Sequence, residues 1–589
     1  MRVMFLSAHA AIWPHAFPEA LVAETLAQHG HEVLYVGCGR EFASHCAAMS
    51  AAGVPWSADA RTKSGICDGC ERNDRLLRTQ FGLAGFSLGS KLTAEDRAEI
   101  ARRVSQTTPA NLLELVVDGV AVGRYALYEL LLNRKKGRLD FSAEEWREYL
   151  DALRNALASL FACRRILDAE SPDRLVVYNS LYSVNRVACV LAERRGIATY
   201  FLHAGGNLSH RLETLLIGRG DGVRFYEELL AYWPGVRDKP CSAPALAEVT
   251  NHVLELLSGR SFLAYSAART ADGGRARESL GIPAGARVLV ATMSSPDERF
   301  AAATVGVMSA AAPPIFATQL DWIRELGAWV SSRPDLFLLV RVHPREFPNK
   351  RESVTSEHAQ TLREALSHLP DNAGVNWPSD NVSLYDLADF ASVFLNAWSA
   401  AGKEMCLLGL PVVAYAPAAL VYPPDLNYVA ASRPDYFARI EQALADGWSA
   451  DRIRAAYRWC ALEYEYAAVH IHESFPWAQR RLSAKLRNLL HRVLHRLGKP
   501  HWLWWIDCRR RKPVRAGKEI CAMLEQKLAT PLSLLEAARG LTSTEAETRA
   551  LRAEVSRILR ALYGDARTGA RSASLQAKLE SFAHAEAAA

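Results

Sequence analysis

Long apolar runs are missing from this chain of 589 residues. A helix that crosses a bilayer needs about 20 consecutive apolar residues, and no stretch reaches that length. The first apolar stretch, Val3 to Leu6, is shorter than the apolar region of a signal peptide and is soon interrupted by His9 and Pro14. We therefore expect a folded cytoplasmic protein without a membrane span.

A strong excess of charge of one sign is also missing. The chain carries 70 basic and 64 acidic residues, a net charge of +6. No recognisable nucleic-acid-binding module accompanies this small excess, so nucleic acid is not an expected partner. An Asp-x-Asp metal signature is absent as well, and no catalytic Mg²⁺ is expected. The distribution of the basic residues matters more than their sum.

Two alternations of strand-like and helical stretches predict an α/β protein with two Rossmann-like, doubly wound domains. The length is too great for one hydrophobic core. We expect a first domain over residues 1–270, with a helical insertion at about 90–170, and a second domain over 286–479. Residues 480–589 read as a basic, amphipathic helical extension.

Polar residues follow the predicted strands of the second domain. Ligands of parallel sheets bind outside the carboxyl ends of the strands, so these residues predict a binding site. Amides of a helix opening near Ser399 and three basic side chains suit an anion, and Glu404 suits a ribose hydroxyl. Helix capping remains the alternative for the serine pair. The candidates are Ser294, Ser295, Arg341, His343, Asn396, Ser399, Gly402, Lys403 and Glu404.

Three segments of the second domain resemble the carboxyl-terminal domain of bacterial capsule polysaccharide glycosyltransferases. They are His343-Pro344, the turn from Asn396 to Glu404, and Gly409 to Val413, within a match that runs from Arg287 to about Tyr457. Similar signatures occur in transferases that use CMP-activated sugars. That family shows Ser-Thr where this chain has Ser399-Ala400.

The resemblance implies a two-Rossmann (GT-B) transferase whose His and Ser bind the donor phosphate and whose Glu binds the ribose. A CMP-sugar is the favoured donor, and UDP- and GDP-sugars remain open. The expected acceptor is a lipid-linked or growing surface polysaccharide. The sequence leaves two rivals, a CDP-alcohol phosphotransferase and a non-catalytic partner in polysaccharide assembly.

The first domain would then hold the acceptor and the general base. Its strand ends carry His9, Asn179 and His203, which we expect in the cleft. His15 and Glu19 lie four residues apart, so the carboxylate could orient the imidazole as the base of an inverting transfer. Capping and surface polarity at a helix start are the alternative for this pair.

Four of the 11 cysteines lie close together in the sequence: Cys38, Cys46, Cys67 and Cys70. The last two have the two-residue spacing that lets both thiolates reach one metal ion, which suggests a structural zinc or an iron–sulfur site. The wider gap of the first pair is unlike a standard zinc knuckle. Four ordinary thiols are the alternative.

The extension begins with leucines on one helical face and arginines on the rest, from Leu482 to Leu497. Clustered tryptophans and arginines follow, from His501 to Lys512. This combination is typical of binding to an anionic membrane surface, here through residues 480–515. We therefore expect the protein on the inner face of the cytoplasmic membrane. A leucine face that docks on the protein itself is the alternative.

Overall fold

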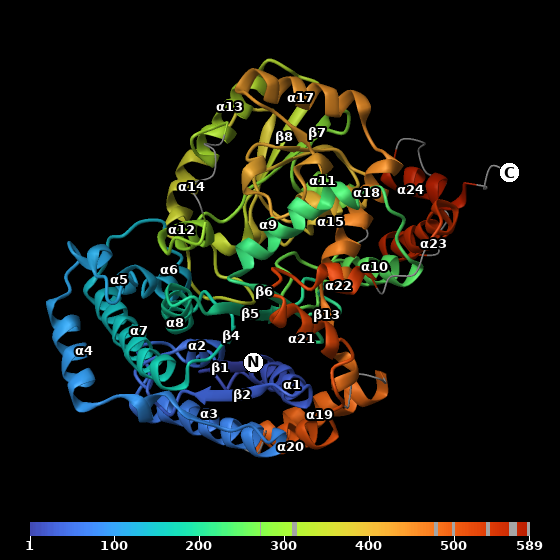
Figure 1. Cartoon of the computed structure of the whole chain (residues 1–589). Helices are drawn as coiled ribbons and strands as arrows, with labels where there is room; N and C mark the ends of the chain where they lie inside the picture. The colour runs from blue at the N-terminus through green and yellow to red at the C-terminus, as the bar shows by residue number, and fades with distance from the viewer. Residues whose placement is uncertain are drawn as a thin grey trace.

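The computed structural model describes residues 1–270, 273–308, 315–475, 481–497, 501–537, 542–564 and 574–585. They form two lobes, each built on a sheet with helices packed against it (Figure 1). The predicted fold class is confirmed: two Rossmann-like domains of the GT-B arrangement, with a helical insertion and a helical carboxyl-terminal extension.

The first sheet has seven strands in the order β13-β6-β5-β4-β1-β2-β3. β1 pairs in parallel with both β2 and β4, whereas β6 and β13 run antiparallel to their neighbours. Helices cover β1 on both sides, which explains why it is apolar throughout instead of alternating. The strands are β1 (Arg2–Ser7), β2 (Glu32–Gly37), β3 (Gly85–Ser87), β4 (Arg174–Tyr178), β5 (Ala198–Ala204), β6 (Thr214–Arg219) and β13 (Val469–His470).

Helix α1 (Trp13–Gln28) follows β1 and begins before both His15 and Glu19. Pro14 occupies one of its first positions, where a missing N–H costs no hydrogen bond. The early start places His15 within the helix, directly after the loop at the carboxyl end of β1. Helix α8 (Ser183–Arg194) follows β4 in the same way.

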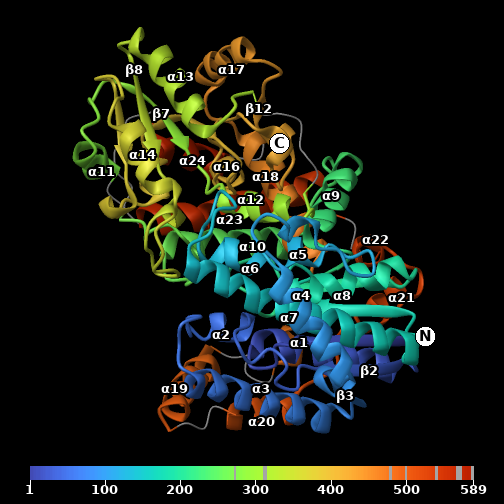
Figure 2. The ribbon, with the colours of Figure 1, turned by 90° about the vertical axis from the view of Figure 1, so that its left-hand side faces the viewer.

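Helices fill the region for which the sequence predicts an insertion, between β3 and β4 (Figure 2). The longest, α7, begins with a capping box in which Ser142 and Glu145 exchange hydrogen bonds of 3.2 and 2.7 Å. It packs along α8 and so joins the insertion to the first sheet. Here and in the segment before it lie α2 (Ala47–Ala51), α3 (Ala60–Phe81), α4 (Ala94–Gln106), α5 (Val122–Tyr125), α6 (Tyr128–Asn133) and α7 (Ala143–Glu170).

The second sheet has six parallel strands in the order β12-β11-β10-β7-β8-β9. Strand order reverses between β7 and β10, so the loops after these two strands face each other at the switch point. The strands are β7 (Arg287–Thr292), β8 (Leu336–Arg341), β9 (Ala373–Asn376), β10 (Ala391–Asn396), β11 (Val412–Ala414) and β12 (Tyr428–Val429). The helices around them are α11 (Gly273–Ser279), α12 (Asp297–Thr304), α13 (Gln319–Ser331), α14 (His358–Leu366), α15 (Leu384–Leu387), α16 (Ala401–Leu407) and α17 (Arg433–Asp446).

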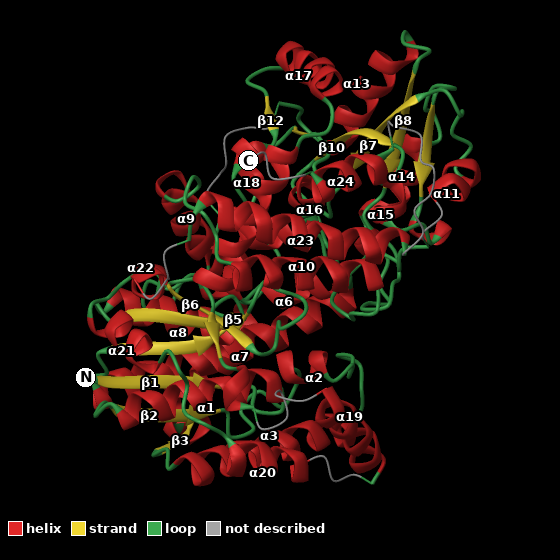
Figure 3. Cartoon of the chain, turned by 90° about the vertical axis from the view of Figure 1, so that its right-hand side faces the viewer, coloured by secondary structure: helices red, strands yellow, loops and turns green. Residues whose placement is uncertain are grey.

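After the second sheet the chain returns to the first. Val469 pairs with Leu215, which adds β13 to the edge of the first sheet, a strand that the sequence analysis did not predict. The extension then follows the first domain, with α20 beside α3 and α21 beside α1, while α23 runs along α10 (Figure 3). The helices of the extension are α19 (Arg481–Arg496), α20 (His501–Arg510), α21 (Gly517–Glu525), α22 (Leu532–Ala537), α23 (Thr544–Tyr563) and α24 (Leu575–His584). The remaining helices, which precede it, are α9 (Gly222–Tyr232), α10 (Ala243–Ser258) and α18 (Ala450–Ala461). Within the described ranges, no helix has both the length and the apolar character needed to cross a bilayer.

Glu547 on α23 ties the extension to the rest of the chain through a buried ion pair. Its carboxylate, 1 % exposed, accepts hydrogen bonds from Arg458 at 2.6 and 2.9 Å and from the N–H of Cys241 at 2.7 Å. Removing one partner of a buried pair costs about 3–5 kcal/mol because a charge remains uncompensated. We expect Glu547→Ala to lower the calorimetric midpoint of unfolding by several degrees.

Asp451→Ala is the control for this variant. Asp451 pairs with Arg454 on the same helix at 2.8 Å, but its side chain is 88 % exposed, and such pairs contribute about 0–1 kcal/mol. Equal losses of stability in the two variants would contradict a structural role for the Glu547 pair.

Candidate functional site

Glu19 lies buried beneath the switch point of the first sheet, between β1 and β4. Its Oε2 accepts a hydrogen bond from Ser7 Oγ at 2.7 Å, and its Oε1 accepts one from the N–H of Tyr178 at 3.0 Å. Ser7 Oγ in turn accepts from the hydroxyl of Tyr35 at 2.8 Å. Because no cation compensates its burial, the pKa of Glu19 rises to about 8. The carboxylate holds two strands together and is only 3 % exposed.

His15 does not form the expected hydrogen bond with Glu19. Its Nδ1 is buried without a hydrogen-bond partner among the residues described, and both Glu19 oxygens are engaged elsewhere. The His15 ring instead stacks on Tyr178, with centroids 4.0 Å apart and planes at 13°. Burial lowers the pKa of His15 to about 3, and the neighbouring His9 and His203 add to the effect. Glu19 therefore acts on His15 only through Tyr178.

Asn179 and His203 lie in one cavity of about 410 Å³ between the lobes, as expected for cleft residues. His9 is placed apart from them, in a small cavity of about 40 Å³ beside Glu129. Asn179 has φ of 60°, a conformation that costs about 1 kcal/mol or more outside glycine. Asn185 stabilises this turn by donating to the carbonyls of Tyr178 and Asn179 at 2.9 and 3.0 Å.

At the second switch point, Asn396 holds the turn that follows β10. It accepts hydrogen bonds from Thr292 Oγ1 at 3.0 Å and from the Ser399 N–H at 3.2 Å, and it donates to the hydroxyl of Tyr422 at 2.9 Å. A side chain at Gly402 would collide with the Tyr422 hydroxyl, 2.0 Å from where its Cβ would lie. The missing side chain of Gly402 therefore makes room for the Tyr422 hydroxyl. The sequence analysis predicts instead that it makes room for a bound anion.

The serine pair after β7 is held by its own domain. Gln319 brackets Ser294 with two hydrogen bonds of 2.8 Å to its N–H and carbonyl. Ser295 Oγ donates to Asp297 at 2.5 Å and to Glu346 at 2.9 Å. Both serines are thus tethered within the second domain, but neither caps α12, which begins without a side-chain cap.

Lys403 and Glu404 are also engaged within the fold. Lys403 forms a buried ion pair with Glu463, which raises its pKa although burial alone would lower it. Glu404 Oε2 accepts a hydrogen bond from Tyr385 at 2.7 Å, and burial raises the pKa of this carboxyl. Neither charge is left without a partner for a ligand.

His343 and Ser399 keep donors that the fold does not use. Nδ1 of His343 accepts the N–H of Arg345 at 3.2 Å, so the neutral ring carries its proton on Nε2. Burial lowers the pKa of His343 to about 4, which keeps the ring neutral. Ser399 Oγ accepts from the N–H of Ala401 at 3.2 Å, and its own hydrogen remains available. Arg341, by contrast, donates to Asn376 at 2.5 Å.

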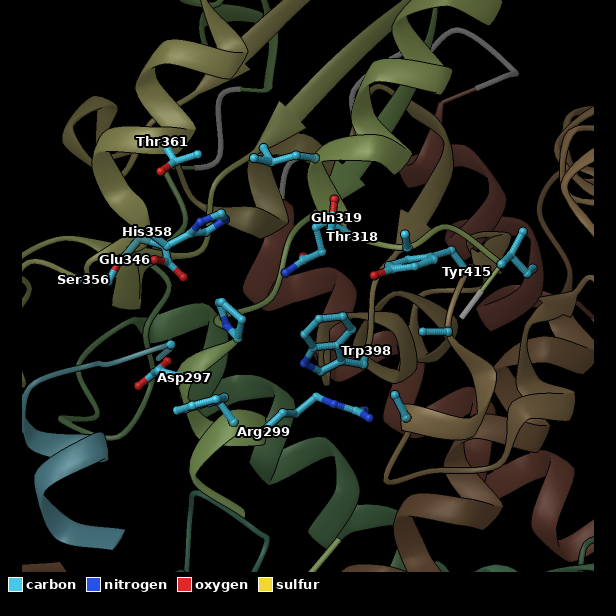
Figure 4. A pocket seen from close by; sticks show the side chains of 18 of the residues that line it. Asp297, Arg299, Thr318, Gln319, Glu346, Ser356, His358, Thr361, Trp398 and Tyr415 are labelled. Carbon is cyan, nitrogen blue, oxygen red and sulfur yellow. Dashed lines mark hydrogen bonds between the residues drawn. The ribbon is translucent and has the colours of Figure 1, made fainter. Parts of the chain in front are cut away.

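A cavity of about 870 Å³ lies at the carboxyl edge of the second sheet and faces the insertion of the first domain. Trp398 and Tyr415 form one wall, and Arg299 from the first turn of α12 lies beside the indole, 5.1 Å from its centroid (Figure 4). Arg299 has no hydrogen bond or ion pair within the described ranges, and its Nη1 is buried. Burial lowers its pKa, as expected for an unpaired cation.

The sequence analysis missed Arg299, and none of its nine candidates is among the described residues that line this cavity. Arg341 instead lines a separate cavity of about 950 Å³. Two signals pointed to the cavity of Arg299. Trp398 stands directly before Ser399 in the turn singled out, and Arg299 opens the helix after β7. An arginine in a first turn usually faces solvent, and only the fold reveals its burial.

The two lobes meet beside this cavity through paired charges. Lys135, 2 % exposed, donates to the carbonyls of Arg345 and Val354 at 2.5 and 2.6 Å and pairs with Glu352 at 3.1 Å. Arg345 in turn pairs with Asp297 at 2.8 Å. These contacts connect the insertion to the segment that follows His343, so the first domain closes one side of the cavity.

Four cysteine side chains, those of Cys38, Cys46, Cys67 and Cys70, line one cavity of about 280 Å³. Burial raises the pKa of each thiol, that of Cys46 to about 11. Cys70 Sγ also accepts the N–H of Ala11 at 3.1 Å. Across the described part of the chain, no group of three or more His, Cys, Asp or Glu side chains is placed to hold a metal ion. The fold brings the thiols together without the geometry of the expected zinc or iron–sulfur site.

The raised pKa of Glu19 provides a test that depends on pH. Its pKa is about 8 in the folded protein against 4.5 unfolded, so at intermediate pH the folded state holds a proton that the unfolded state releases. This contribution to stability is complete below the unfolded pKa and is lost as pH rises through the folded pKa, by up to about 1.4 kcal/mol per pH unit. We expect Glu19→Gln, which mimics the neutral acid, to gain stability relative to wild type between about pH 5 and pH 8 in calorimetry. A constant difference over this range would contradict the assignment.

No protein-family model and no curated protein sequence matches the chain. Solved structures that resemble it include UDP-GlcNAc 2-epimerase from Neisseria meningitidis bound to UDP-GlcNAc, with 12 % identity over 79 % of this chain and 98 % of that one, and a TM-score of 0.22. Spinosyn rhamnosyltransferase SpnG complexed with thymidine diphosphate has 14 % identity over 83 % and 100 %, with a TM-score of 0.24. KpsC of Thermosulfurimonas dismutans, a beta Kdo 2,4 transferase, has 16 % identity over 51 % and 83 %, with a TM-score of 0.29. Sequence identities and TM-scores this low do not indicate the function of this chain, which depends on its own residues.

Proposed function

We propose that the chain is a glycosyltransferase that moves a sugar from a nucleotide-activated donor to a lipid-linked or growing surface polysaccharide. The cavity that contains Arg299 and Trp398 carries this proposal. Its volume of about 870 Å³ falls in the range of ligand pockets, and it lies where doubly wound sheets bind nucleotides. An aromatic wall suits a base, and a buried unpaired guanidinium suits a phosphate.

The donor phosphate would be bound by three groups that the fold leaves available. They are the guanidinium of Arg299, which lines the cavity, and two groups outside its lining, the Nε2–H of His343 and the hydroxyl hydrogen of Ser399. Each would stabilise the negative charge that develops on the phosphate when the bond to the sugar breaks. The resemblance of the His343 and Ser399 segments supports a CMP-sugar, with UDP- and GDP-sugars as the alternatives to test.

The transfer we propose inverts the anomeric centre. An acceptor hydroxyl attacks the anomeric carbon while the bond from that carbon to the phosphate oxygen breaks, and its electron pair leaves with the nucleotide. We propose His15 as the acceptor of the hydroxyl proton. Burial keeps its ring unprotonated, but the same lowered pKa makes it a weak base, so the negative charge of the bound donor has to raise this pKa for the transfer to occur. Glu19 is a positioning residue in this scheme, because it fixes Tyr178, on which His15 stacks.

A panel of CMP-, CDP-, UDP- and GDP-compounds tests the donor site by thermal shift. A ligand at about 100 times its Kd adds roughly 2.7 kcal/mol of stability. We expect one nucleotide family to raise the unfolding midpoint of wild type, and Arg299→Met to lose most of this shift because it keeps the apolar stem without the charge. Arg324→Met, at a side chain 71 % exposed on α13, is the control and should keep the shift. No shift with any nucleotide would contradict the proposed function.

The extension supports a lipid-linked acceptor at the inner face of the cytoplasmic membrane. Arg492 and Arg496 are exposed along α19, which suits anionic headgroups. Four aliphatic side chains and two tryptophans are exposed with them, which favours membrane insertion over docking on the protein. They are Leu486 (51 %), Leu489 (51 %), Val493 (44 %), Leu497 (63 %), Trp502 (58 %) and Trp505 (47 %).

The same extension is fixed to the acceptor domain. Trp13 at the start of α1 stacks on Trp504 at 4.9 Å and donates to Asp507 at 3.0 Å, and Arg511 pairs with Glu24. A membrane bound by α19 would therefore lie beside the domain that carries His15. This arrangement suits an acceptor whose other end stays in the bilayer.

Glutamate substitutions on α19 test the membrane contact. We expect the full chain with Leu486→Glu, Leu489→Glu and Val493→Glu to sediment with anionic vesicles at least about tenfold less than wild type, because three apolar side chains can no longer insert. The matched control carries Leu113→Glu and Val116→Glu, at positions 39 % and 51 % exposed in the insertion. Wild type should bind vesicles of neutral lipid weakly. Unchanged sedimentation of the α19 variant would overturn the membrane role of this face.

A further inference from the structure

A second cavity between the lobes, of about 410 Å³, adjoins the proposed donor cavity. It lies at the carboxyl ends of β4 and β5 and is closed on the other side by Leu420 and Val421 of the second domain. Both cavities are lined by Ala418 and Ala419, so they meet at the short turn over Pro417–Ala419. A molecule in the second cavity would therefore lie next to a donor in the first.

Arg211 supplies a cation to this cavity that the fold does not neutralise. Its side chain lines the cavity and makes no ion pair or hydrogen bond within the ranges that the structure describes. Burial lowers the pKa of Arg211, and the nearby Arg351 of the second domain lowers it further. A guanidinium placed this way costs stability unless an anion binds it.

Ser180 adds a second unsatisfied group to the same cavity. Its residue is 1 % exposed, and its Oγ has no hydrogen-bond partner among the described residues. The strained turn at Asn179 brings it there from the end of β4. Buried hydroxyls are normally hydrogen-bonded, so an unpaired hydroxyl in the wall of a cavity that also holds an unpaired cation suits an anionic ligand.

The loop that carries Arg211 is held rigidly. Asn207 donates to the carbonyl of Glu248 at 3.0 Å, and the Leu208 N–H donates to His252 Nδ1 at 3.0 Å. The N–H of Gly205 donates to the carbonyls of Arg211 and Thr214, each at 3.0 Å. The loop is thus hydrogen-bonded at both ends, whereas the guanidinium of Arg211 is not hydrogen-bonded within the described ranges. Such preorganisation reduces the entropy cost of binding a ligand.

We propose that this cavity binds an anionic group of the acceptor, a phosphate or a carboxylate, through the guanidinium of Arg211 and the hydroxyl of Ser180. The proposal rests on the proposed glycosyl transfer, in which the donor phosphate occupies the cavity of Arg299. A neutral acceptor would leave Arg211 buried and unpaired, so the site selects against it. Arg211 is then a specificity-determining residue for the acceptor.

Substitution of Arg211 distinguishes this role from a structural one. Without ligand, we expect Arg211→Met to unfold at the same temperature as wild type or higher, because it removes an uncompensated buried charge. Arg224→Met, at an exposed position on the neighbouring helix α9, is the matched control and should leave the midpoint unchanged. A clear loss of stability in Arg211→Met alone would show that the guanidinium has partners in the fold and would overturn the proposal.

Calorimetric titration of the full chain with inorganic phosphate, glucuronate and neutral glucose tests the anion itself. We expect phosphate or glucuronate to bind, glucose not to bind, and Arg211→Met to weaken the anion about tenfold or more, as loss of a charge-assisted hydrogen bond predicts. Binding of phosphate alone would identify a phosphate-bearing end, and binding of glucuronate alone a sugar acid. The anion should bind Arg224→Met as it binds wild type. Loss of anion binding in Arg299→Met but not in Arg211→Met would assign the anion to the donor cavity and overturn the proposal.

Nucleotide binding separates failure of this proposal from failure of the proposed function. Arg211→Met should keep the full thermal shift with the donor nucleotide. Loss of that shift would assign Arg211 to the donor phosphate and overturn the proposal. Absence of anion binding in wild type, or equal anion binding in Arg211→Met, would overturn it while the donor site stands. If no nucleotide binds wild type, the proposed function fails on its own.

Discussion

Partly buried guanidinium groups without carboxylate partners set the energetics of the space between the two lobes. Arg299 and Arg211 each face a cavity there, and neither is paired within the described ranges. Both side chains are only partly buried, so each unpaired charge costs less than a fully buried one would. Lys135 and Arg345, which join the lobes, are by contrast fully engaged. Pairing thus distinguishes the cations that hold the fold from those available to ligands.

Most of the fold could be predicted from the sequence because parallel strands buried on both faces are apolar throughout. Val3 to Leu6 and Leu336 to Val340 stand out for this reason, and both belong to interior strands of their sheets. The return of the chain through Val469 and His470 could not be predicted. A strand of two residues has no periodicity of its own, and its partner β6 lies before all six strands of the second sheet in the sequence.

The sequence predicts which residues stand at the strand ends, but not which of their atoms the fold leaves available. Polar residues at the strand ends do meet at the switch points, as Thr292 and Asn396 show. Which of their atoms remain available for a ligand depends on partners far away in the sequence. Lys403 is neutralised by Glu463, and Ser295 is held by Glu346. The sequence places Arg299 at the start of the helix after β7, but it does not show that Arg299 and Arg211 stay unpaired, because the lack of a partner is a property of the folded chain.

The position of β13 has a consequence for synthesis. The first sheet lacks this edge strand, and α20 and α21 are absent from its helical cover, until the whole second domain has left the ribosome. At about 5–20 residues per second, the interval between β6 and β13 amounts to roughly 10–50 s. During that time the edge of β6 is unpaired, and an unpaired edge invites association with other chains. The two lobes therefore cannot fold independently in the order of synthesis. The first domain is complete only after the second domain and the residues that follow it have been synthesised.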